Sequence, residues 1–548
     1  METPRSYQSD ADIDQDVEKK VPYDGDIVYP SATTDSDHAP VMRRHLKSRH
    51  IAFIGLGGGI GVGLFVGVGK GLSVAGPLGL FLAFTIMGAI MWGVLQGAAE
   101  MAAVIPTAGG FPHFAARFID PALGFALGWN YAVGYALSVA SELSACAIII
   151  SYWSDLNAAI WIAILCIPFL VLNMLGVKFY GESEVITASL KVITLVGLII
   201  LGLVIDLGGA PSGDRIGFRY WQNPGAMREL PGVGGGSKAR FLAFFSAFIS
   251  AAYSYTGTET VILAAGEASN PSKQIPRAAK RVMYRIIIFY VLGVLIIGMI
   301  VPFNEPRLLG GSDNAASSPW VIAIEKAGIK VLPHIINAVI LTSAWSAGNT
   351  YVFTSSRTLY GLALQGHAPK FFTRISKQGV PWTCVLAVWL VSLLSFLSAG
   401  SGGAAAAFGW LQNLTALAAL NAWATIAYAA ARMSQAFKKQ GISRDTIPFR
   451  APLSPWVQYF SSFFCSVIIL FSGFSVFLNG NWSTSDFFAN YISLFLYIAP
   501  YIGYKIIKKT KYVRSADADL FSGRLRPEEE FEEKPSTSVA GRVFDRLF

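Results

Sequence analysis

The chain has 548 residues, of which 53% are hydrophobic and only 14% are charged, and its net charge is +9. Soluble globular proteins carry about 25% charged residues, so the composition excludes that class and indicates a polytopic membrane protein. Nucleic-acid binding is excluded because the basic residues flank apolar segments instead of forming one patch. The cysteines lie in apolar segments without paired spacing, so no disulfide framework, metal site or cofactor is expected from Cys146, Cys166, Cys384 and Cys465.

Residues 1–45 precede the first apolar segment and are polar and acidic. The first forty residues hold ten Asp or Glu against three Lys or Arg, and they lack the apolar core of a cleavable signal peptide. This composition predicts a disordered, cytoplasmic N-terminal tail. Residues 509–548 are predicted to form a second cytoplasmic tail at the C-terminus.

Twelve apolar segments follow the N-terminal tail, and each is long enough to cross a hydrocarbon core of about 30 Å. They define a transporter domain over residues 46–508. Their approximate bounds are 51–73, 78–103, 121–150, 158–177, 184–206, 240–266, 282–302, 332–365, 382–400, 404–431, 456–478 and 485–507.

The charges between these segments predict which side of the membrane each connection faces. Cytoplasmic connections carry an excess of Lys and Arg near the ends of the spans. The short connections at 152–157, 401–403 and 479–484 contain neither residue. The opposite connections are rich in them, with Arg117, Lys178, Lys273, Arg277, Lys280, Arg281, Lys370, Arg374, Lys377, Lys438, Lys439, Arg444 and Arg450. Both termini are therefore expected in the cytoplasm.

The centre of the first segment is a glycine cluster, Gly57-Gly58-Gly59-Ile60-Gly61-Val62-Gly63. Glycine disfavours a helix interior by about 1 kcal/mol relative to alanine, and irregular backbone at membrane depth occurs only where protein or a water-filled cavity satisfies it. The cluster therefore predicts a broken helix that lines a binding site. One alternative is a phosphate-binding loop, which would need a preceding strand. The other is close helix packing through the glycines at every fourth position, Gly55, Gly59, Gly63 and Gly67.

A second interruption lies in the sixth segment, where the polar stretch 251–260 places Gly257 and the carboxyl group of Glu259 between two apolar halves. Paired, glycine-interrupted segments in two halves of a chain indicate the substrate site of a transporter built from inverted repeats. We therefore predict an all-α polytopic membrane protein of twelve transmembrane helices, with two inverted five-helix repeats, broken helices 1 and 6, and two extra helices. The repeats would cover residues 51–206 and 240–431, and the extra helices residues 456–507.

Two helix breaks suit a zwitterionic ligand, because free amides at one half-helix end favour a carboxylate and free carbonyls at the other favour an ammonium. We expect the amides of residues 61–63 to hold a carboxylate, and carbonyls near Ile54, Gly57 and Tyr255 to accept from an amine. Tyr253 and Tyr255 would wall or gate the site, or else belong to the core. The predicted substrate-binding residues are Gly57, Gly59, Ile60, Gly61, Val62, Gly63, Tyr253, Tyr255, Thr256, Gly257 and Glu259.

Three ionisable residues inside predicted spans stand out as candidates: Glu142, Lys191 and Glu259. Each is costly in lipid unless it is paired or faces a cavity. Burial makes a lysine release its proton more easily, and a nearby carboxylic acid can recharge it. Lys191 is therefore the leading candidate for proton coupling, with Glu259 and Glu142 as further candidates. The alternatives are structural: Lys191 would tie the fifth span to backbone carbonyls of the first and eighth, and Glu142 would hold helices together.

A set of ordered motifs runs from about residue 46 to residue 455. In chain order they are Leu46-Lys47-Ser48-Arg49-His50-Ile51, Ile60-Gly61-Val62-Gly63-Leu64-Phe65, Asp120-Pro121-Ala122-Leu123-Gly124-Phe125-Ala126-Leu127-Gly128-Trp129-Asn130, Thr256-Gly257-Thr258-Glu259, Glu267-Ala268-Ser269-Asn270-Pro271, Ile275-Pro276-Arg277-Ala278, Lys438-Lys439-Gln440-Gly441 and Pro448-Phe449-Arg450-Ala451-Pro452. With these motifs the chain resembles the fungal amino acid permeases of the amino acid, polyamine and organocation superfamily.

The resemblance implies a twelve-helix fold and proton-coupled uptake of amino acids across a fungal plasma membrane, with the amino acid, protons and the lipid bilayer as partners. Relatives use the first-span glycines for the carboxylate and amine, the sixth-span break for the amine and side chain, and the Lys191 position in proton coupling. This chain departs from the family at Gly59 and Val62, where members usually have Thr or Ser. An imino acid, an ω-amino acid or a pathway-specific amino acid therefore stays open as the substrate.

Three other functional classes fit the sequence less well than a symporter. A nutrient sensor of the same fold would bind an amino acid without transporting it, but long specialised tails would be expected, and those predicted here are short. A channel would show a ring of charges or a filter motif. An enzyme would show a nucleophile, a base and an orienting residue, or a cluster of metal ligands. We expect no enzyme, and the sensor or a carrier for a related amine stays the alternative.

Overall fold

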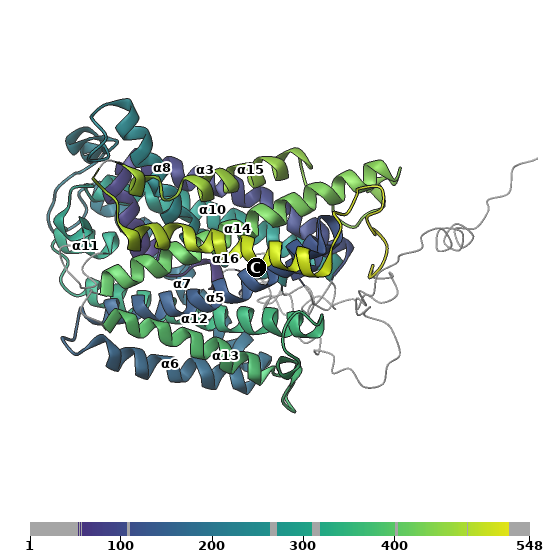
Figure 1. The fold of residues 1–548 in the computed structure, drawn as a ribbon. Helices are drawn as coiled ribbons and strands as arrows, with labels where there is room; N and C mark the ends of the chain where they lie inside the picture. Colours follow the sequence, from purple (N-terminus) through teal and green to yellow (C-terminus); the bar gives the residue numbers. More distant parts are fainter. Residues whose placement is uncertain are drawn as a thin grey trace, which may run out of the picture. The chain divides into compact units, whose positions relative to one another are not determined.

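A computed structural model describes residues 53, 55, 57–106, 110–263, 271–309, 318–399, 404–478 and 480–524. The chain divides into two units, and all contacts reported below lie within the second, Asp37–Phe548. In the described ranges the regular secondary structure is helical, apart from one isolated β-bridge between Leu207 and Arg215 (Figure 1). The tail predicted over residues 1–45, and the part of the C-terminal tail from residue 525 onward, lie outside the described residues.

The α-helices are α3 (Val68–Val104), α4 (Gly110–Phe118), α5 (Pro121–Ile150), α6 (Ala158–Leu175), α7 (Val177–Asp206), α8 (Ser237–Tyr255), α9 (Thr260–Leu263), α10 (Pro271–Ile300), α11 (Pro319–Lys326), α12 (Leu332–Leu364), α13 (Trp382–Ser392), α14 (Ala404–Lys439), α15 (Trp456–Phe471) and α16 (Thr484–Lys508). Short 3₁₀ or π turns join or extend them at η1 (Gly63–Gly67), η2 (Trp221–Gly225), η4 (Pro306–Leu309), η6 (Lys370–Thr373), η7 (Leu393–Ala399), η8 (Arg444–Thr446) and η9 (Phe474–Phe477).

Local sequence explains where several of these helices begin. Asp120 precedes α5, and its side chain accepts a hydrogen bond from the amide of Ala122 at 2.9 Å, with proline in the first helical position. Asn157 caps α6 in the same way. These are the residue types that satisfy the free amides of a first helical turn.

Within α3, Gly76 adopts φ +75° and is followed by proline, so the helix divides at this residue. The backbone groups left unpaired at this division form hydrogen bonds with the loop at 226–228. Leu78 donates its N–H to the carbonyl of Ala226, and Arg228 donates its N–H to the carbonyl of Ala75. A glycine is needed here because the left-handed conformation disfavours any side chain.

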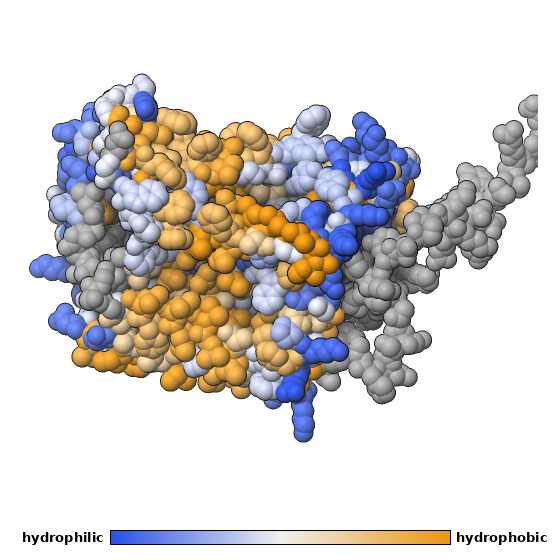
Figure 2. Space-filling model, viewed as in Figure 1, coloured by the Kyte–Doolittle hydropathy of each residue, from blue (hydrophilic) through white to orange (hydrophobic). Residues whose placement is uncertain are grey.

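Nine helices in the described ranges are long and apolar enough to cross a membrane. The face seen in Figure 2 carries a broad hydrophobic band between hydrophilic ends. Helices α6 and α7 expose large apolar side chains along their length, including Ile160, Ile164, Ile167, Val171, Ile186, Ile193 and Ile200. Exposed apolar surface on this scale, along helices long enough to cross a bilayer, is expected where lipid covers the protein. The chain is therefore a multi-pass membrane protein.

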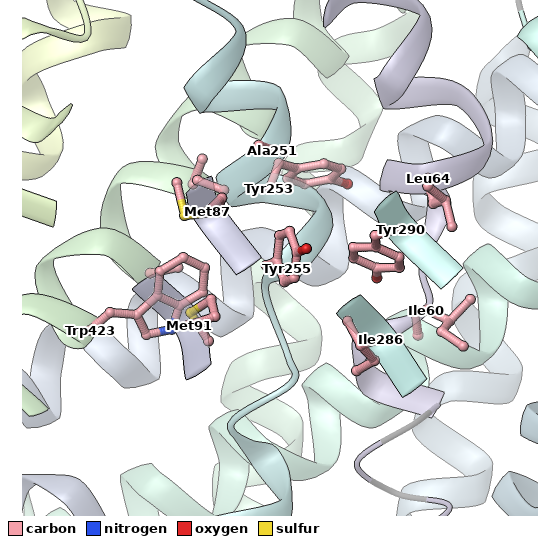
Figure 3. Close-up of a cluster of buried hydrophobic side chains, with 14 of the residues drawn as sticks. Ile60, Leu64, Met87, Met91, Ala251, Tyr253, Tyr255, Ile286, Tyr290 and Trp423 are labelled. Carbon is pink, nitrogen blue, oxygen red and sulfur yellow. The ribbon is translucent and has the colours of Figure 1, made fainter. Parts of the chain in front are cut away.

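The core forms around two groups of helices. Helix α5 packs against α12 and α14, and most of its side chains are buried. Helix α3 packs against α8 and α10. A cluster of large side chains fills the space among α3, α8, α10 and α14, with Tyr255, Tyr290 and Trp423 fully buried (Figure 3). Helices α6 and α13 lie together at one edge of the bundle (Figure 1).

Residues 509–524 continue from α16 and pack against the ends of α4, α5 and α14. The amide of Val513 donates to the carbonyl of Ile119 at 2.8 Å, and Leu520 is fully buried. Arg117 forms an ion pair with Asp519 at 3.0 Å. Burial raises the pKa of the Asp519 carboxyl, but Arg117 and nearby amide and hydroxyl donors lower it more, so the pKa lies below its usual value. The first part of the predicted C-terminal tail is thus a packed element.

Candidate functional site: two broken helices and a buried charge cluster

The first predicted span is interrupted at the glycine cluster. Residues 57–59 are helical, the chain bends at Ile60 and Gly61, and helix resumes as the π-turn η1 before α3. The short π-turn was not expected from the sequence. Single π-turns inside helices are rare and often mark functional sites.

Four consecutive carbonyl groups at this break accept hydrogen bonds from side chains of other helices. The donor and acceptor pairs are Lys191 Nζ to Gly57 at 2.6 Å, Tyr351 OH to Gly58 at 3.1 Å, Tyr290 OH to Gly59, and Ser343 Oγ to Ile60 at 3.2 Å. The donors come from α7, α10 and α12. Protein groups therefore satisfy the irregular backbone, as membrane depth requires.

The sixth predicted span is broken after α8. Thr256 leaves the helical conformation, Gly257 has φ +92°, and helix resumes at α9. Tyr290 and Tyr351 link this break to the first one. Tyr290 OH also donates to the carbonyl of Ser254 at 2.7 Å, and Tyr351 OH donates to the carbonyl of Thr256 at 3.3 Å.

The backbones of the two breaks are in direct contact. A Cβ atom added at Gly257 would lie 2.3 Å from the carbonyl oxygen of Gly58. Similarly, a Cβ at Gly59 would lie 2.9 Å from the Thr258 side chain, and one at Gly63 would lie 2.7 Å from Cα of Ser254. The glycines thus allow both helix packing and a backbone break, and the two interpretations do not exclude each other.

Two of the predicted intramembrane charges lie at the first break. Glu142 of α5 is buried and accepts a hydrogen bond from Tyr253 OH at 3.4 Å. Lys191 of α7 interacts electrostatically with Glu142 in addition to its bond to the carbonyl of Gly57. The contact with Gly57 is the one expected from the structural alternative, in which Lys191 ties span 5 to a backbone carbonyl of span 1. The same contact places the ammonium group beside the predicted substrate site.

A third buried charge, Glu184, was missed. It lies 3.9 Å from Lys191 and accepts hydrogen bonds from Ser346 Oγ at 3.0 and 3.1 Å. The expected span 184–206 begins at this residue, whereas α7 begins at Val177, so Glu184 lies about two turns inside the helix. Its spacing of seven residues from Lys191 was the signal that could have found it, because such residues share a helix face.

Glu259, in the sixth-span break, has hydrogen-bond partners from α5 and α14. Its Oε1 atom accepts from Tyr135 OH at 2.8 Å and from Trp423 Nε1 at 2.9 Å, while Oε2 is buried without a hydrogen-bond partner. Tyr131 OH continues this network to Tyr135 at 3.1 Å. The sequence did not single out Tyr135 or Trp423.

The two predicted gate tyrosines have different surroundings. Tyr253 OH is 2.9 Å from Ser141 Oγ and close to Glu142, so it belongs to the charge cluster. Tyr255 OH donates to the carbonyl of Phe84 in α3 at 3.1 Å, and its ring lies beside Tyr290 (Figure 3). The hydroxyl of Tyr255 has a hydrogen-bond partner and its ring is buried in the core, as expected if this residue has a packing role and not a gating role.

A small cavity lies between α5, α14 and the sixth-span break. It is lined by Asn130, Tyr131, Gly134, Tyr135, Ser138, Thr256, Thr415, Ala418 and Ala419. Its lining includes hydroxyl groups and one amide but no ionised side chain. Thr256 connects the cavity to the predicted substrate-binding residues.

Comparison with known proteins identifies the family. A model described as amino acid permease matches residues 50–515. The chain belongs to the amino acid permease family. It is 41% identical to a proline-specific permease of Emericella nidulans, over 88% of both chains. It is 44% identical to a lysine-specific permease of Saccharomyces cerevisiae, over 88% of this chain and 79% of the relative. The expected resemblance to fungal permeases is confirmed, and the family is one of transporters, not enzymes.

Solved structures support the fold at lower similarity. A manganese transporter of Eremococcus coleocola is 14% identical, with a TM-score of 0.52 over 86% of this chain and 98% of that one. A mutant of that transporter superposes with a TM-score of 0.54. At this identity the likeness concerns the fold alone.

Proposed function

We propose that this protein is a proton-coupled symporter that imports amino acids across the plasma membrane by alternating access. Both termini lie in the cytoplasm in this proposal. The chain then crosses the membrane twelve times, with α3 contributing to two spans on either side of Gly76 and with α8 and α12 among the others. Two inverted five-helix repeats and two extra helices account for this number.

The observation that carries the proposal is the meeting of two broken helices beside a buried ammonium group. The first and sixth spans touch at Gly58 and Gly257, and Lys191 binds the first of them through the carbonyl of Gly57. Broken helices expose backbone donors and acceptors of opposite sign, which suit the carboxylate and ammonium of any amino acid. A lysine buried at membrane depth is costly, and such a residue is by default a candidate for a functional role.

The cavity beside the sixth-span break supports a neutral side chain on the substrate. Its lining residues bear hydroxyl, amide and methyl groups but no ionised group. The relatives divide between proline-specific, lysine-specific and dicarboxylic amino acid permeases. In this structure the cavity has room for about one water molecule, so a substrate side chain would enter only after the site opens. The groups it would then meet are neutral, and an ionised side chain would find no counter-charge among them. We therefore place this chain with the carriers of neutral amino acids, including the imino acid proline.

Uptake by transport-deficient yeast cells that express the protein tests the proposal. The labels are radioactive L-proline, L-lysine and L-aspartate, and each of twenty amino acids is then used as a competitor. We expect proline uptake that rises when the medium is acidified and collapses with a protonophore, because the proton gradient drives it. Uptake that ignores both treatments would refute the coupling, and preferential uptake of lysine or aspartate would refute the neutral side chain.

A further inference from the structure

We propose that Glu184 is the residue that takes the proton from Lys191 on its way to the cytoplasm. This inference rests on the proposed proton-coupled transport and adds a residue to it. It follows from three buried charges that lie beside the break in the first span: Glu142, Lys191 and Glu184.

Helix α7 carries two of the three charges on one face. Glu184 and Lys191 are seven residues apart, which is about two helical turns or 10 Å along the axis. The side chain of each is 1% exposed, and Glu184 Oε1 lies 3.9 Å from Lys191 Nζ. Ser346 of α12 donates to Glu184, and Thr187 Oγ1 lies 2.9 Å from Ser346 Oγ. Glu184 is therefore held in a defined position below the ammonium group.

The first span makes room for both carboxylates. An added Cβ at Gly57 would lie 1.6 Å from Glu184 Oε1, and one at Gly61 would lie 2.8 Å from Glu142 Oε1. These glycines are four residues apart. The irregular backbone between them thus separates the two carboxylates, and Lys191 binds it through the carbonyl of Gly57.

The proposed orientation puts the three groups in order across the membrane. Helices α5 and α7 both run from the cytoplasmic to the outer side. Glu142 lies in the second half of α5, whereas Glu184 lies in the first third of α7 and Lys191 near its middle. Glu142 is then the outer carboxylate and Glu184 the inner one, with the lysine between them.

A proton can pass along this line in two balanced steps. Neutral Glu142 gives its proton to the amine of Lys191, which leaves a carboxylate and an ammonium. The ammonium later gives a proton to the carboxylate of Glu184, which leaves an amine and a carboxylic acid, and that acid releases the proton to cytoplasmic water. Both transfers need the groups to move closer together. Glu184 Oε1 lies 3.9 Å from Lys191 Nζ and the Glu142 carboxyl lies farther away than that, whereas a hydrogen bond spans about 2.8 Å.

The carbonyl of Gly57 controls that second step. It holds Lys191 Nζ at 2.6 Å and so competes with Glu184 for the ammonium. If the first span moves away when the site opens inward, Lys191 loses this acceptor and turns to Glu184. The other titratable groups that face the cluster are Tyr253 from α8, Tyr290 from α10, Tyr351 from α12 and Cys146 from α5, and α12 also presents the hydroxyl of Ser346.

Glu184→Gln tests the assignment, because the amide oxygen can still accept from Ser346 but cannot take a proton. Purified protein in liposomes is assayed with labelled L-proline, or with whichever label the cells take up. Two readouts are compared: accumulation driven by a pH gradient, and exchange of internal for external substrate, which needs no net proton transfer. We expect accumulation to fall to an inside-to-outside ratio of about one with exchange retained, because substrate flux is uncoupled from the proton gradient.

Glu100→Gln is the matched control. Glu100 is also buried and ion-paired, to Arg444, but it lies at the end of α3 away from the cluster, so accumulation is expected to persist. If Glu184→Gln does not fold, the pair Glu184→Asp and Glu184→Asn decides, with accumulation expected only from the carboxylate.

Three outcomes would overturn the assignment. If the Glu184→Gln variant accumulates substrate as the wild type does, no proton passes through Glu184. A folded variant that loses exchange as well gives Glu184 a role in substrate handling. In the fallback pair, equal accumulation by the Asp and Asn variants excludes proton acceptance. A wild type that ignores the pH gradient refutes the proposed function instead.

Discussion

Gly257→Ala is expected to destabilise the protein by forcing apart the two broken spans. An alanine Cβ at this position would lie 2.3 Å from the carbonyl oxygen and 2.8 Å from the carbonyl carbon of Gly58. Both are backbone atoms, so no side-chain rotation can relieve the overlap. The residue also has φ +92°, which disfavours any side chain.

The size of the effect follows from these two costs. A residue with a side chain in a left-handed conformation costs about 1–2 kcal/mol, and overpacking a filled interior costs about 1–3 kcal/mol. The expected loss in the free energy of unfolding is therefore about 2–5 kcal/mol. Transport should be lost with it, because the backbone that the substrate would approach is displaced.

The assay is the thermal unfolding of the solubilised, fluorescently tagged protein, together with uptake by expressing cells. Gly197→Ala is the matched control. Gly197 lies in α7, and an added Cβ there meets nothing within 4 Å. That variant should gain up to about 1 kcal/mol, because alanine favours a helix interior over glycine. Wild-type melting behaviour of Gly257→Ala would refute the close approach of the two breaks.

Two further variants test contacts at other places. Tyr290→Phe removes the hydroxyl that donates to the carbonyls of Gly59 and Ser254, and we expect a loss of about 1–3 kcal/mol in thermal unfolding experiments; unchanged stability would mean that other donors replace it. Asp519→Asn should loosen residues 513–523. In the wild type, pairing with Arg117 lowers the pKa of Asp519 and stabilises the folded protein. This stabilisation is fully present above the usual carboxyl pKa of about 3.9, and it is lost as the pH falls through the lowered pKa. Amide hydrogen exchange of the segment measures both effects, and protection that is the same in both proteins would contradict this account.

Both helix breaks could be predicted from the sequence because glycine and polar residues are rare in the middle of apolar segments. Gly57, Gly257 and Lys191 stood out for this reason, and all three lie at the meeting of the two breaks. The tie from Lys191 to the first span was likewise foreseeable. A buried ammonium needs acceptors, and a broken helix offers free carbonyls.

The partners of the breaks could not be predicted. Tyr351 lies 293 positions from Gly58 in the chain, and Tyr290 lies 231 positions from Gly59. Each is a tyrosine in an apolar segment, which by itself indicates ordinary core packing. Only the three-dimensional arrangement shows that their hydroxyls satisfy the broken backbone.

Glu184 was missed for a different reason. Hydropathy places a span where apolar residues become continuous, and a charge near that boundary is assigned to the surface. Helix α7 extends seven residues before Glu184, which brings this side chain into the protein interior. A boundary error of a few residues therefore concealed a member of the charge cluster.

The packing of residues 509–524 has a consequence for biosynthesis. Asp120, the residue before α5, is almost fully buried and bonds to Lys505 and Thr510, which are synthesised 385 and 390 positions later. At about 5–20 residues per second, the ribosome needs roughly 20–80 s to produce these partners. Until then Asp120 lacks both of these partners, so the nascent chain cannot complete this end of the bundle before residue 510 has been synthesised.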